Sequence, residues 1–135
     1  LHAPSPKNNA LAPLILVVDD SSTVRKVTSH LLERNGFQVL TAKDGEEALT
    51  LVETKRPDCI LLDLEMPKLD GFGFLEALNK SKKNTMPVIV ISSRSMDKYK
   101  KRAFQLGACE FLSKPFQNEQ LLEQIEKNLK GKKNA

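Results

Sequence analysis

Long apolar runs and cysteines are scarce in this chain of 135 residues, and both absences limit what it can be. No stretch is long and apolar enough to cross a bilayer, and no charged-then-apolar signal peptide opens the chain. The two cysteines, Cys59 and Cys109, stand in apolar surroundings, so we expect buried free thiols rather than a disulfide. These features predict a cytoplasmic domain without membrane insertion.

A basic folded face is also lacking, although the formal net charge of the chain is +4. All 17 acidic residues lie between Asp19 and Glu126, whereas the surplus of lysine lies near the two ends. Residues 14–126 therefore carry 16 basic against 17 acidic residues, a net charge of −1. Because a nucleic-acid-binding domain usually concentrates its basic residues on a folded face, the composition predicts no nucleic-acid partner.

The two ends differ in composition from the middle of the chain. Residues 1–13 contain three prolines together with serine and asparagine, which is typical of a linker or of a remnant of processing. The ending "KGKKNA" predicts a disordered basic tail over residues 130–135. We therefore expect one domain over residues 14–129. Because the chain starts with Leu rather than Met, we expect it to be part of a longer protein.

Five short apolar runs alternate with segments of helical periodicity. The runs are "LILVV" (14–18), "FQVLTA" (37–42), "CILLD" (59–63), "PVIVI" (87–91) and "CEFLS" (109–113). The apolar stripes of the segments that follow are Val24, Val27 and Leu31; Leu75 and Leu78; Tyr99, Ala103 and Leu106; and Leu121, Leu122, Ile125 and Leu129. Asp44 with Glu47 forms a capping box for the second helix, and Ser95 can cap the fourth. Five strand–helix units with apolar strands predict an α/β domain whose parallel sheet is covered on both faces.

Polar groups follow four of the five predicted strands. Asp19 and Asp20 come after the first strand, Asp63 ends the third, Ser92 follows the fourth and Lys114 follows the fifth. In an open α/β sheet, ligands bind outside the carboxyl ends of the strands. We therefore expect three carboxylates, a hydroxyl and an ammonium group to meet at one edge.

Three carboxylates that lie close together repel one another, and a hard divalent cation relieves that repulsion. Mg²⁺ prefers oxygen ligands and is usually held by one or two carboxylates, waters and a phosphate. A phosphoryl group on Asp63 would need a cation and a hydrogen-bond donor, which Lys114 and Ser92 can supply. The pattern therefore predicts that Asp63 is a nucleophile in phosphoryl transfer.

The motifs that carry these residues are "LVVDDSSTVRK", "DGEEAL", "PDCILLDLEMPKLDGFGFL", "PVIVISSRS" and "GACEFLSKPF". In this order, over roughly residues 14–129, they resemble the receiver domain of two-component response regulators. The resemblance implies a (βα)5 flavodoxin-like fold with the parallel strand order 2-1-3-4-5. It also implies a phosphoacceptor signalling domain, not an enzyme, whose Asp63 takes its phosphoryl group from a phosphohistidine of a histidine kinase or histidine phosphotransfer domain.

The resemblance assigns the metal site residue by residue. Asp20 matches the direct ligand of Mg²⁺ (or Mn²⁺), and Asp19 matches the acid that usually reaches the metal through water. Asp63 is a further ligand, and Glu65 stands where the family's backbone carbonyl coordinates the metal.

The resemblance also assigns the phosphoryl contacts and the switch. Ser92 matches the switch hydroxyl, Lys114 the lysine that contacts the phosphoryl group, and Phe111 the aromatic residue that rotates. The bond between Lys114 and Pro115 is expected to be cis. On sequence alone, Phe111 is as well explained as a fixed core residue, and the basic run "KYKKR" (98–102) as a solvated helix face.

Three shorter motifs, "TVRKVT", "LLERNG" and "TAKDG", narrow the resemblance. They are similar to receivers at the C-terminal end of chemotaxis-type hybrid histidine kinases, including those that control type IV pili. They imply a downstream motility or chemosensory protein as a partner. Single-domain receivers of motility systems share much of this pattern, so both contexts stay open.

Two other functions fit parts of the pattern. A haloacid-dehalogenase-type phosphatase also uses a nucleophilic aspartate and an acid two residues later, a role that Glu65 could fill. Its nucleophile normally ends the first strand, however, whereas Asp63 ends the third. A degenerate receiver that only binds proteins is the other alternative, but all five chemical positions are filled here.

Overall fold

The computed structural model describes residues 12–65, 71–81, 86–94 and 96–134. Along the chain the elements are β1 (Leu14–Val18), α1 (Ser22–Arg34), β2 (Gln38–Ala42), α2 (Gly45–Lys55), β3 (Cys59–Asp63), α3 (Gly71–Ser81), β4 (Val88–Ser92), α4 (Asp97–Gln105), β5 (Glu110–Ser113) and α5 (Asn118–Asn134). Strands and helices alternate five times, as the sequence predicts. Each predicted strand lies within two residues of its observed bounds.

The five strands form one parallel sheet in the order β2-β1-β3-β4-β5. The predicted flavodoxin-like fold and its strand order are therefore confirmed. The order places β3 in the middle, with β1 on one side and β4 on the other. The ends of neighbouring strands are consequently adjacent: Val18 pairs with Leu62, the residue before Asp63, and Ser92 pairs with Ser113.

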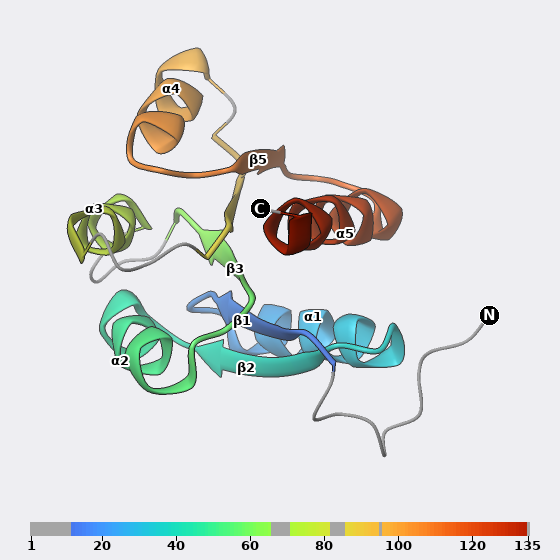
Figure 1. Cartoon of the computed structure of the whole chain (residues 1–135). Helices are drawn as coiled ribbons and strands as arrows, with labels where there is room; N and C mark the ends of the chain where they lie inside the picture. Colours follow the sequence, from blue (N-terminus) through green and yellow to red (C-terminus); the bar gives the residue numbers. More distant parts are fainter. Residues whose placement is uncertain (1–11, 66–70, 82–85, 95, 135) are drawn as a thin grey trace.

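The strands contribute side chains to two separate hydrophobic layers, because successive side chains point to opposite faces of the sheet. In β1, Ile15 and Val17 belong to the layer under α1 and α5, whereas Leu16 and Val18 belong to the layer under α2, α3 and α4. Figure 1 shows α1 and α5 on one side of the sheet and α2 and α3 on the other. This two-sided burial explains why β1, β3 and β4 are apolar up to their last residues.

Local signals fix where two of the helices begin. The Ser21 hydroxyl accepts a hydrogen bond from the backbone N–H of Val24, which caps α1. At α2, the Asp44 carboxylate accepts from the N–H of Glu47, and the Glu47 carboxylate accepts from the N–H of Lys43. The predicted capping box therefore forms, with its return bond one residue before the N-cap.

The structure corrects three details of the sequence-based prediction. Cys59 is buried, but Cys109 is exposed, and both thiols are free. Helix α5 continues to Asn134, so residues 130–134 are helical where the composition predicted a disordered tail. Ser95 lies outside the described residues, and Met96 is the N-cap of α4 without a side-chain bond.

The third correction concerns α1. Val24 and Val27 are exposed, although their helical spacing with Leu31 predicted a buried stripe. The buried residues of α1, Leu31 and Leu32, lie in its C-terminal half.

No helix within the described residues is long and apolar enough to span a membrane.

Candidate functional site

Three carboxylates meet at the carboxyl edge of the sheet and form what we call the acidic half of the site. Asp19 directly follows β1, Asp20 comes next, and Asp63 is the last residue of β3. One carboxylate oxygen from each residue lies within 4.8 Å of the others. Asp19 and Asp63 are each only 6% exposed, whereas Asp20 is exposed. The predicted convergence of these acids is therefore present in the structure.

The environment of Asp19 disfavours its charge. Burial raises the pKa of Asp19 to about 6, and repulsion from Asp63 adds to this rise. A hydrogen bond from the N–H of Ser21 at 2.8 Å opposes the rise in part. The guanidinium of Arg25 does not relieve this, because it donates to the backbone carbonyl of Asp19 at 2.7 Å rather than to its carboxylate.

This half of the site fits a hard divalent cation. All three side chains offer oxygen atoms, and the crowding that raises the pKa of Asp19 is the repulsion that a bound cation would relieve. Asp20 is exposed, so a partly hydrated ion can reach the cluster. Asp19, Asp20 and Asp63 are therefore the residues that could hold Mg²⁺ or Mn²⁺.

Hydrogen-bond donors from β4 and β5 face the acids and form the donor half of the site: Ser92, Ser93 and Lys114. The Nζ atom of Lys114 lies 3.6 Å from Oδ1 of Asp63. The Lys114–Pro115 bond is cis, the geometry that the resemblance implies. Ser92 is fully buried, and its Oγ accepts from the N–H of Arg94 at 2.9 Å.

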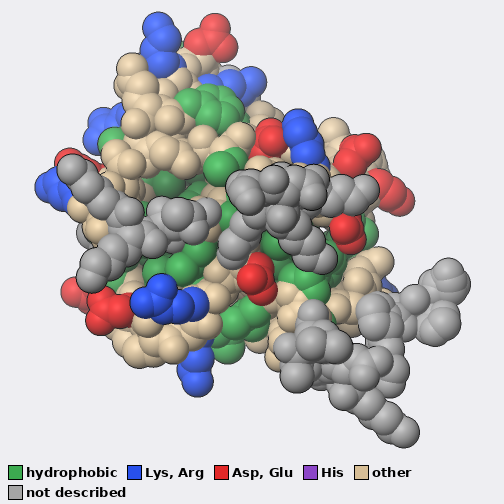
Figure 2. All heavy atoms as spheres, in the orientation of Figure 1, with side chains coloured by type: hydrophobic (Ala, Val, Ile, Leu, Met, Phe, Trp, Pro, Cys, Tyr) green, Lys and Arg blue, Asp and Glu red, His purple; other side chains and the backbone are tan. Residues whose placement is uncertain are grey.

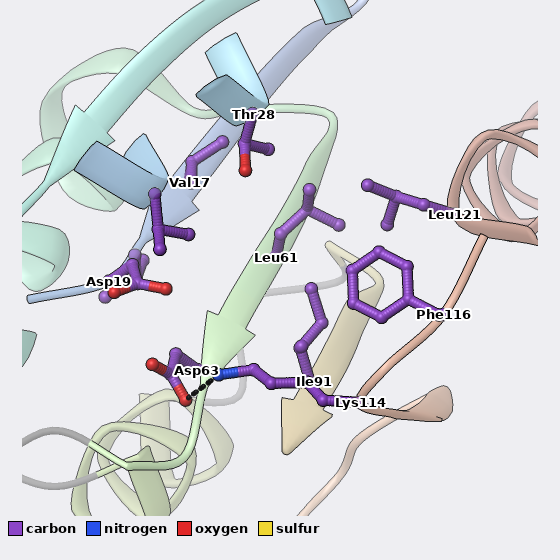
Figure 3. A pocket seen from close by; sticks show the side chains of 11 residues that line it. Val17, Asp19, Thr28, Leu61, Asp63, Ile91, Lys114, Phe116 and Leu121 are labelled. Carbon is purple, nitrogen blue, oxygen red and sulfur yellow. Dashed lines mark ion pairs between the residues drawn. The ribbon is translucent and has the colours of Figure 1, made fainter. Parts of the chain in front are cut away.

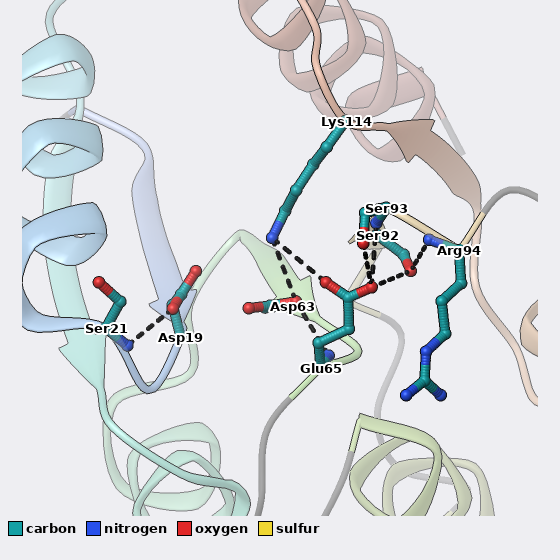
Figure 4. A network of polar contacts seen from close by, with 8 residues as sticks. All are labelled: Asp19, Ser21, Asp63, Glu65, Ser92, Ser93, Arg94 and Lys114. Atoms are coloured by element: carbon teal, nitrogen blue, oxygen red, sulfur yellow. Dashed lines mark hydrogen bonds and ion pairs between the residues drawn. The ribbon is translucent and has the colours of Figure 1, made fainter.

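The donor half holds the side chain of Glu65 (Figure 4). Its Oε2 accepts hydrogen bonds from Ser92 Oγ at 3.2 Å, from the N–H of Ser93 at 3.1 Å and from Ser93 Oγ at 2.5 Å. Its Oε1 lies 3.6 Å from Nζ of Lys114. Partial burial acts to raise the pKa of Glu65, but the bonds from Ser93 and the charge of Lys114 outweigh it, so that this pKa is lowered.

The sequence pattern did not predict this role of the Glu65 side chain, and it placed Ser93 beside Ser92 at the end of the fourth strand without giving it a role. The resemblance assigned only the backbone carbonyl of Glu65. The available signal was a carboxylate two residues after Asp63, together with two adjacent serines at the end of β4. Because β3 and β4 are neighbours in the sheet, their ends had to face each other.

An apolar wall bounds the site on the side of α1 and α5. A pocket of about 50 Å³ lies there, and Figure 3 shows Asp19, Asp63 and Lys114 at its polar end. The rest of its lining is mostly apolar: Val17, Val18, Val24, Thr28, Leu61, Ile91, Phe116 and Leu121. The carboxyl edge of the sheet is therefore bounded by apolar side chains on one side and is open beside the exposed Asp20.

Phe111 lies in β5, apart from the acids. It is half-buried and packs against the layer under α2, α3 and α4. The ammonium group of Lys100, in α4, lies 5.9 Å from the centre of its ring. Phe111 therefore contacts both the hydrophobic core and helix α4.

Comparison with known families decides the class of the protein. The model of the response regulator receiver domain matches residues 15–126, which is most of the chain. The chain belongs to the response regulator receiver family. Receivers are the phosphoacceptor domains of two-component signalling, phosphorylated by histidine kinases, and they are signalling domains rather than classical enzymes. The phosphatase alternative is thereby set aside.

Several of the curated relatives are named as transcriptional regulatory proteins. The chain is 40% identical over 102 residues to the alkaline phosphatase synthesis transcriptional regulatory protein PhoP of Bacillus subtilis, covering 76% of this chain and 42% of PhoP. It is 43% identical over 105 residues to the transcriptional regulatory protein PrrA of Mycobacterium tuberculosis, covering 78% and 45% respectively. The chain thus spans less than half of the length of these relatives. Their names do not support the prediction that nucleic acid is excluded as a partner.

Solved structures agree on the fold but differ in biological setting. The chemotaxis protein CheY4 of Vibrio cholerae has a TM-score of 0.81 and 33% identity, covering 86% of this chain and 98% of that one. The receiver domain of a signal transduction histidine kinase from Syntrophus aciditrophicus has a TM-score of 0.85 and 32% identity, covering 92% and 95% respectively. Receivers from both settings share the fold, so the narrower resemblance to hybrid kinases is not shown by these comparisons.

Proposed function

We propose that Asp63 is the residue of this receiver that accepts the phosphoryl group. The observation that carries the proposal is the position of its carboxylate. It lies at the carboxyl end of the central strand, clustered with Asp19 and Asp20 and 3.6 Å from the ammonium group of Lys114. No other carboxylate among the described residues combines this cluster of acids with an ammonium group.

In this proposal Asp19, Asp20 and Asp63, with the backbone carbonyl of Glu65, hold Mg²⁺ or Mn²⁺. The ion, when bound, supplies positive charge against the crowded carboxylates and the incoming phosphoryl oxygens. The residues themselves fix the geometry: the N–H of Ser21 orients Asp19, and the N–H of Glu65 orients Asp63 through a 2.9 Å bond to its Oδ1.

The chemical step is a displacement at phosphorus. A carboxylate oxygen of Asp63 attacks the phosphorus of a phosphohistidine, and a P–O bond forms while the P–N bond breaks. The imidazole nitrogen leaves with the electron pair and takes a proton from solvent. Lys114 and the Ser92 hydroxyl then contact the transferred oxygens, because charge-assisted hydrogen bonds to phosphate are stronger than neutral ones.

Intact-mass spectrometry after treatment with acetyl phosphate and Mg²⁺ tests the assignment of the acceptor. We expect the parent protein to gain the mass of one phosphoryl group, which is lost slowly. The variant Asp63→Asn should gain none, because an amide is a poor nucleophile. Asp97→Asn, on exposed α4, is the matched control and should behave like the parent. An unchanged yield of phosphorylated Asp63→Asn would reject Asp63, whereas rapid turnover of acetyl phosphate would favour a phosphatase.

We further propose that phosphorylation draws the Ser92 hydroxyl toward Asp63 and lets Phe111 rotate inward. The affected surface would comprise α4, β5 and α5. Its α4 part contains Lys98, Lys100, Lys101 and Arg102, and Figure 2 shows basic side chains gathered at that end of the molecule. A basic surface of this kind suits an acidic protein partner.

Chemical-shift mapping with beryllofluoride, a phosphoryl mimic, tests this switch. We expect shifts throughout residues 92–122 in addition to the loops around Asp20, Asp63 and Lys114. A population shift of this kind requires the mimic to bind one conformation more tightly than the other. Shifts confined to those loops would reject the switch and favour a phosphate sink.

For the biological setting, we propose a cytoplasmic receiver whose direct donor is a histidine kinase or a histidine phosphotransfer domain, with a motility or chemosensory protein downstream. The similarity to a receiver of a histidine kinase and to a chemotaxis protein supports this setting. The transcriptional regulators among the curated relatives support a different output. The rates of phosphotransfer from a panel of phosphorylated kinases drawn from both settings would distinguish the two.

A further inference from the structure

The side chain of Glu65 occupies the donors that a phosphoryl group would need. Four contacts converge on its carboxylate: the hydroxyl groups of Ser92 and Ser93, the N–H of Ser93 and the ammonium group of Lys114. These are a hydroxyl, a backbone amide and a cation, the set of groups that binds phosphate oxygens in proteins. Figure 4 shows the Glu65 carboxylate between Lys114 and the two serines, beside Asp63.

A phosphoryl group on Asp63 cannot share these donors with Glu65 without cost. The hydroxyl of Ser92 has a single proton to donate, and that proton is donated to Oε2 of Glu65. Lys114 lies at the same distance, 3.6 Å, from Asp63 and from Glu65. A second negative group beside Glu65 would also repel its carboxylate.

We propose that Glu65 is a positioning residue that competes with the phosphoryl group, holding Ser92, Ser93 and Lys114 until phosphorylation displaces it. This inference rests on the proposed role of Asp63 as the acceptor. It adds that part of the binding energy of the phosphoryl group is used to break the contacts of Glu65. The affinity of the site for a phosphoryl group is therefore set below what its donors alone would give.

Titration with beryllofluoride in saturating Mg²⁺, followed by calorimetry, tests the competition. Glu65→Gln keeps the shape of the side chain but removes its charge. We expect it to bind beryllofluoride about tenfold more tightly than the parent, the scale of one charge-assisted hydrogen bond. Ser93→Ala, which removes one hydroxyl bond to Glu65 and leaves every carboxylate in place, should shift the affinity in the same direction by a smaller factor.

The matched control is Glu76→Gln, which removes an exposed carboxylate on α3 that pairs with Lys80 at 3.9 Å. Its affinity should stay within about twofold of the parent, because an exposed charge away from the site is screened. Mg²⁺ affinity in the absence of beryllofluoride is the second readout. It should change much less than beryllofluoride affinity in Glu65→Gln, since the proposed metal contact of Glu65 is its backbone carbonyl; a distorted site would change both.

The outcomes separate this inference from the proposed function. If the parent fails to bind beryllofluoride, or Asp63→Asn binds it equally well, the proposed acceptor is wrong. If the parent binds it normally and Glu65→Gln binds equally or more weakly, with circular dichroism like that of the parent, the competition by Glu65 is rejected. A failure of Glu65→Gln to fold would leave Ser93→Ala to decide, and an unchanged affinity in that variant would reject the competition.

Discussion

The two halves of the site face each other across β3 but are in opposite electrostatic states. In the acidic half, Asp19, Asp20 and Asp63 are crowded, and burial with repulsion from Asp63 raises the pKa of Asp19 to about 6. In the donor half, the Glu65 carboxylate is held by Ser93, Ser92 and Lys114, and these contacts lower its pKa despite partial burial.

The difference shows what each half lacks before phosphorylation. The acidic half has an excess of negative charge that its own residues do not neutralise, so it is suited to gain a cation. The donor half already has an anionic partner from the same chain, so a phosphoryl group must replace that partner rather than fill an empty site. Lys114 is the residue common to both halves, since it contacts both Asp63 and Glu65.

Removal of this shared cation should have the largest effect. Lys114→Met keeps most of the side-chain stem but loses the contacts to Asp63 and Glu65. We expect beryllofluoride affinity, measured by calorimetry in saturating Mg²⁺, to fall by roughly 10–100-fold, the scale of one hydrogen bond to a charged group. Lys127→Met, which loses an exposed ion pair with Glu110, is the control and should bind like the parent. Equal affinities in the two variants would show that Lys114 does not contact the phosphoryl group.

Metal binding should distinguish the acidic half from the donor half. Mg²⁺ without phosphate should raise the melting temperature of the parent, since a ligand at 100 times its Kd stabilises the native state by about 2.7 kcal/mol. Asp20→Ala should reduce this gain more than Asp19→Ala, and Ser93→Ala should leave it unchanged. Thermal melts across a series of Mg²⁺ concentrations measure these gains. A gain that is the same in all three variants and the parent would place the cation elsewhere.

The sequence could predict which residues meet at the site because strand ends are set by simple patterns. Apolar runs end at Asp19, Asp63 and Ser92, and parallel strands bring their carboxyl ends to one edge. The contacts of Glu65 could not be predicted in this way. They join residues 27 and 28 positions apart, with α3 and β4 between them in the chain, and depend on the direction of a side chain that belongs to no strand.

The same limit explains the errors at α1 and β5. Helical spacing indicates that Val24 and Val27 share a face with Leu31, but not where along the helix the contact with the sheet stops. Cys109 precedes β5, an edge strand, so its apolar neighbours did not ensure its burial. Periodicity gives the direction of a side chain, whereas burial also requires a helix or strand that packs over that side chain.

The strain in the acidic half predicts a pH-dependent stability. The pKa of Asp19 in the folded state, about 6, is above its ordinary value of 3.8, so protonation of Asp19 favours folding. In metal-free buffer, Asp19→Asn should be more stable than the parent by roughly 1–3 kcal/mol at pH 7.5. The difference should shrink as the pH falls through 6 and vanish near 4. Urea unfolding at several pH values measures it; a difference that does not depend on pH would contradict the account of Asp19.

The donor half should show the opposite and smaller dependence. The pKa of Glu65 is lowered on folding, so its contribution to stability is present above its ordinary value of 4.5 and is lost as the pH falls through the lower folded value. Without metal or phosphate, Glu65→Gln should therefore be less stable than the parent at pH 7.5, by roughly 0.5–1 kcal/mol because the group is partly exposed to solvent. The two proteins should converge below pH 4.5. The same urea series measures this, with Glu76→Gln as the control. If Glu65→Gln were instead more stable at pH 7.5, Glu65 would be strained like Asp19, and the contrast between the two halves would not hold.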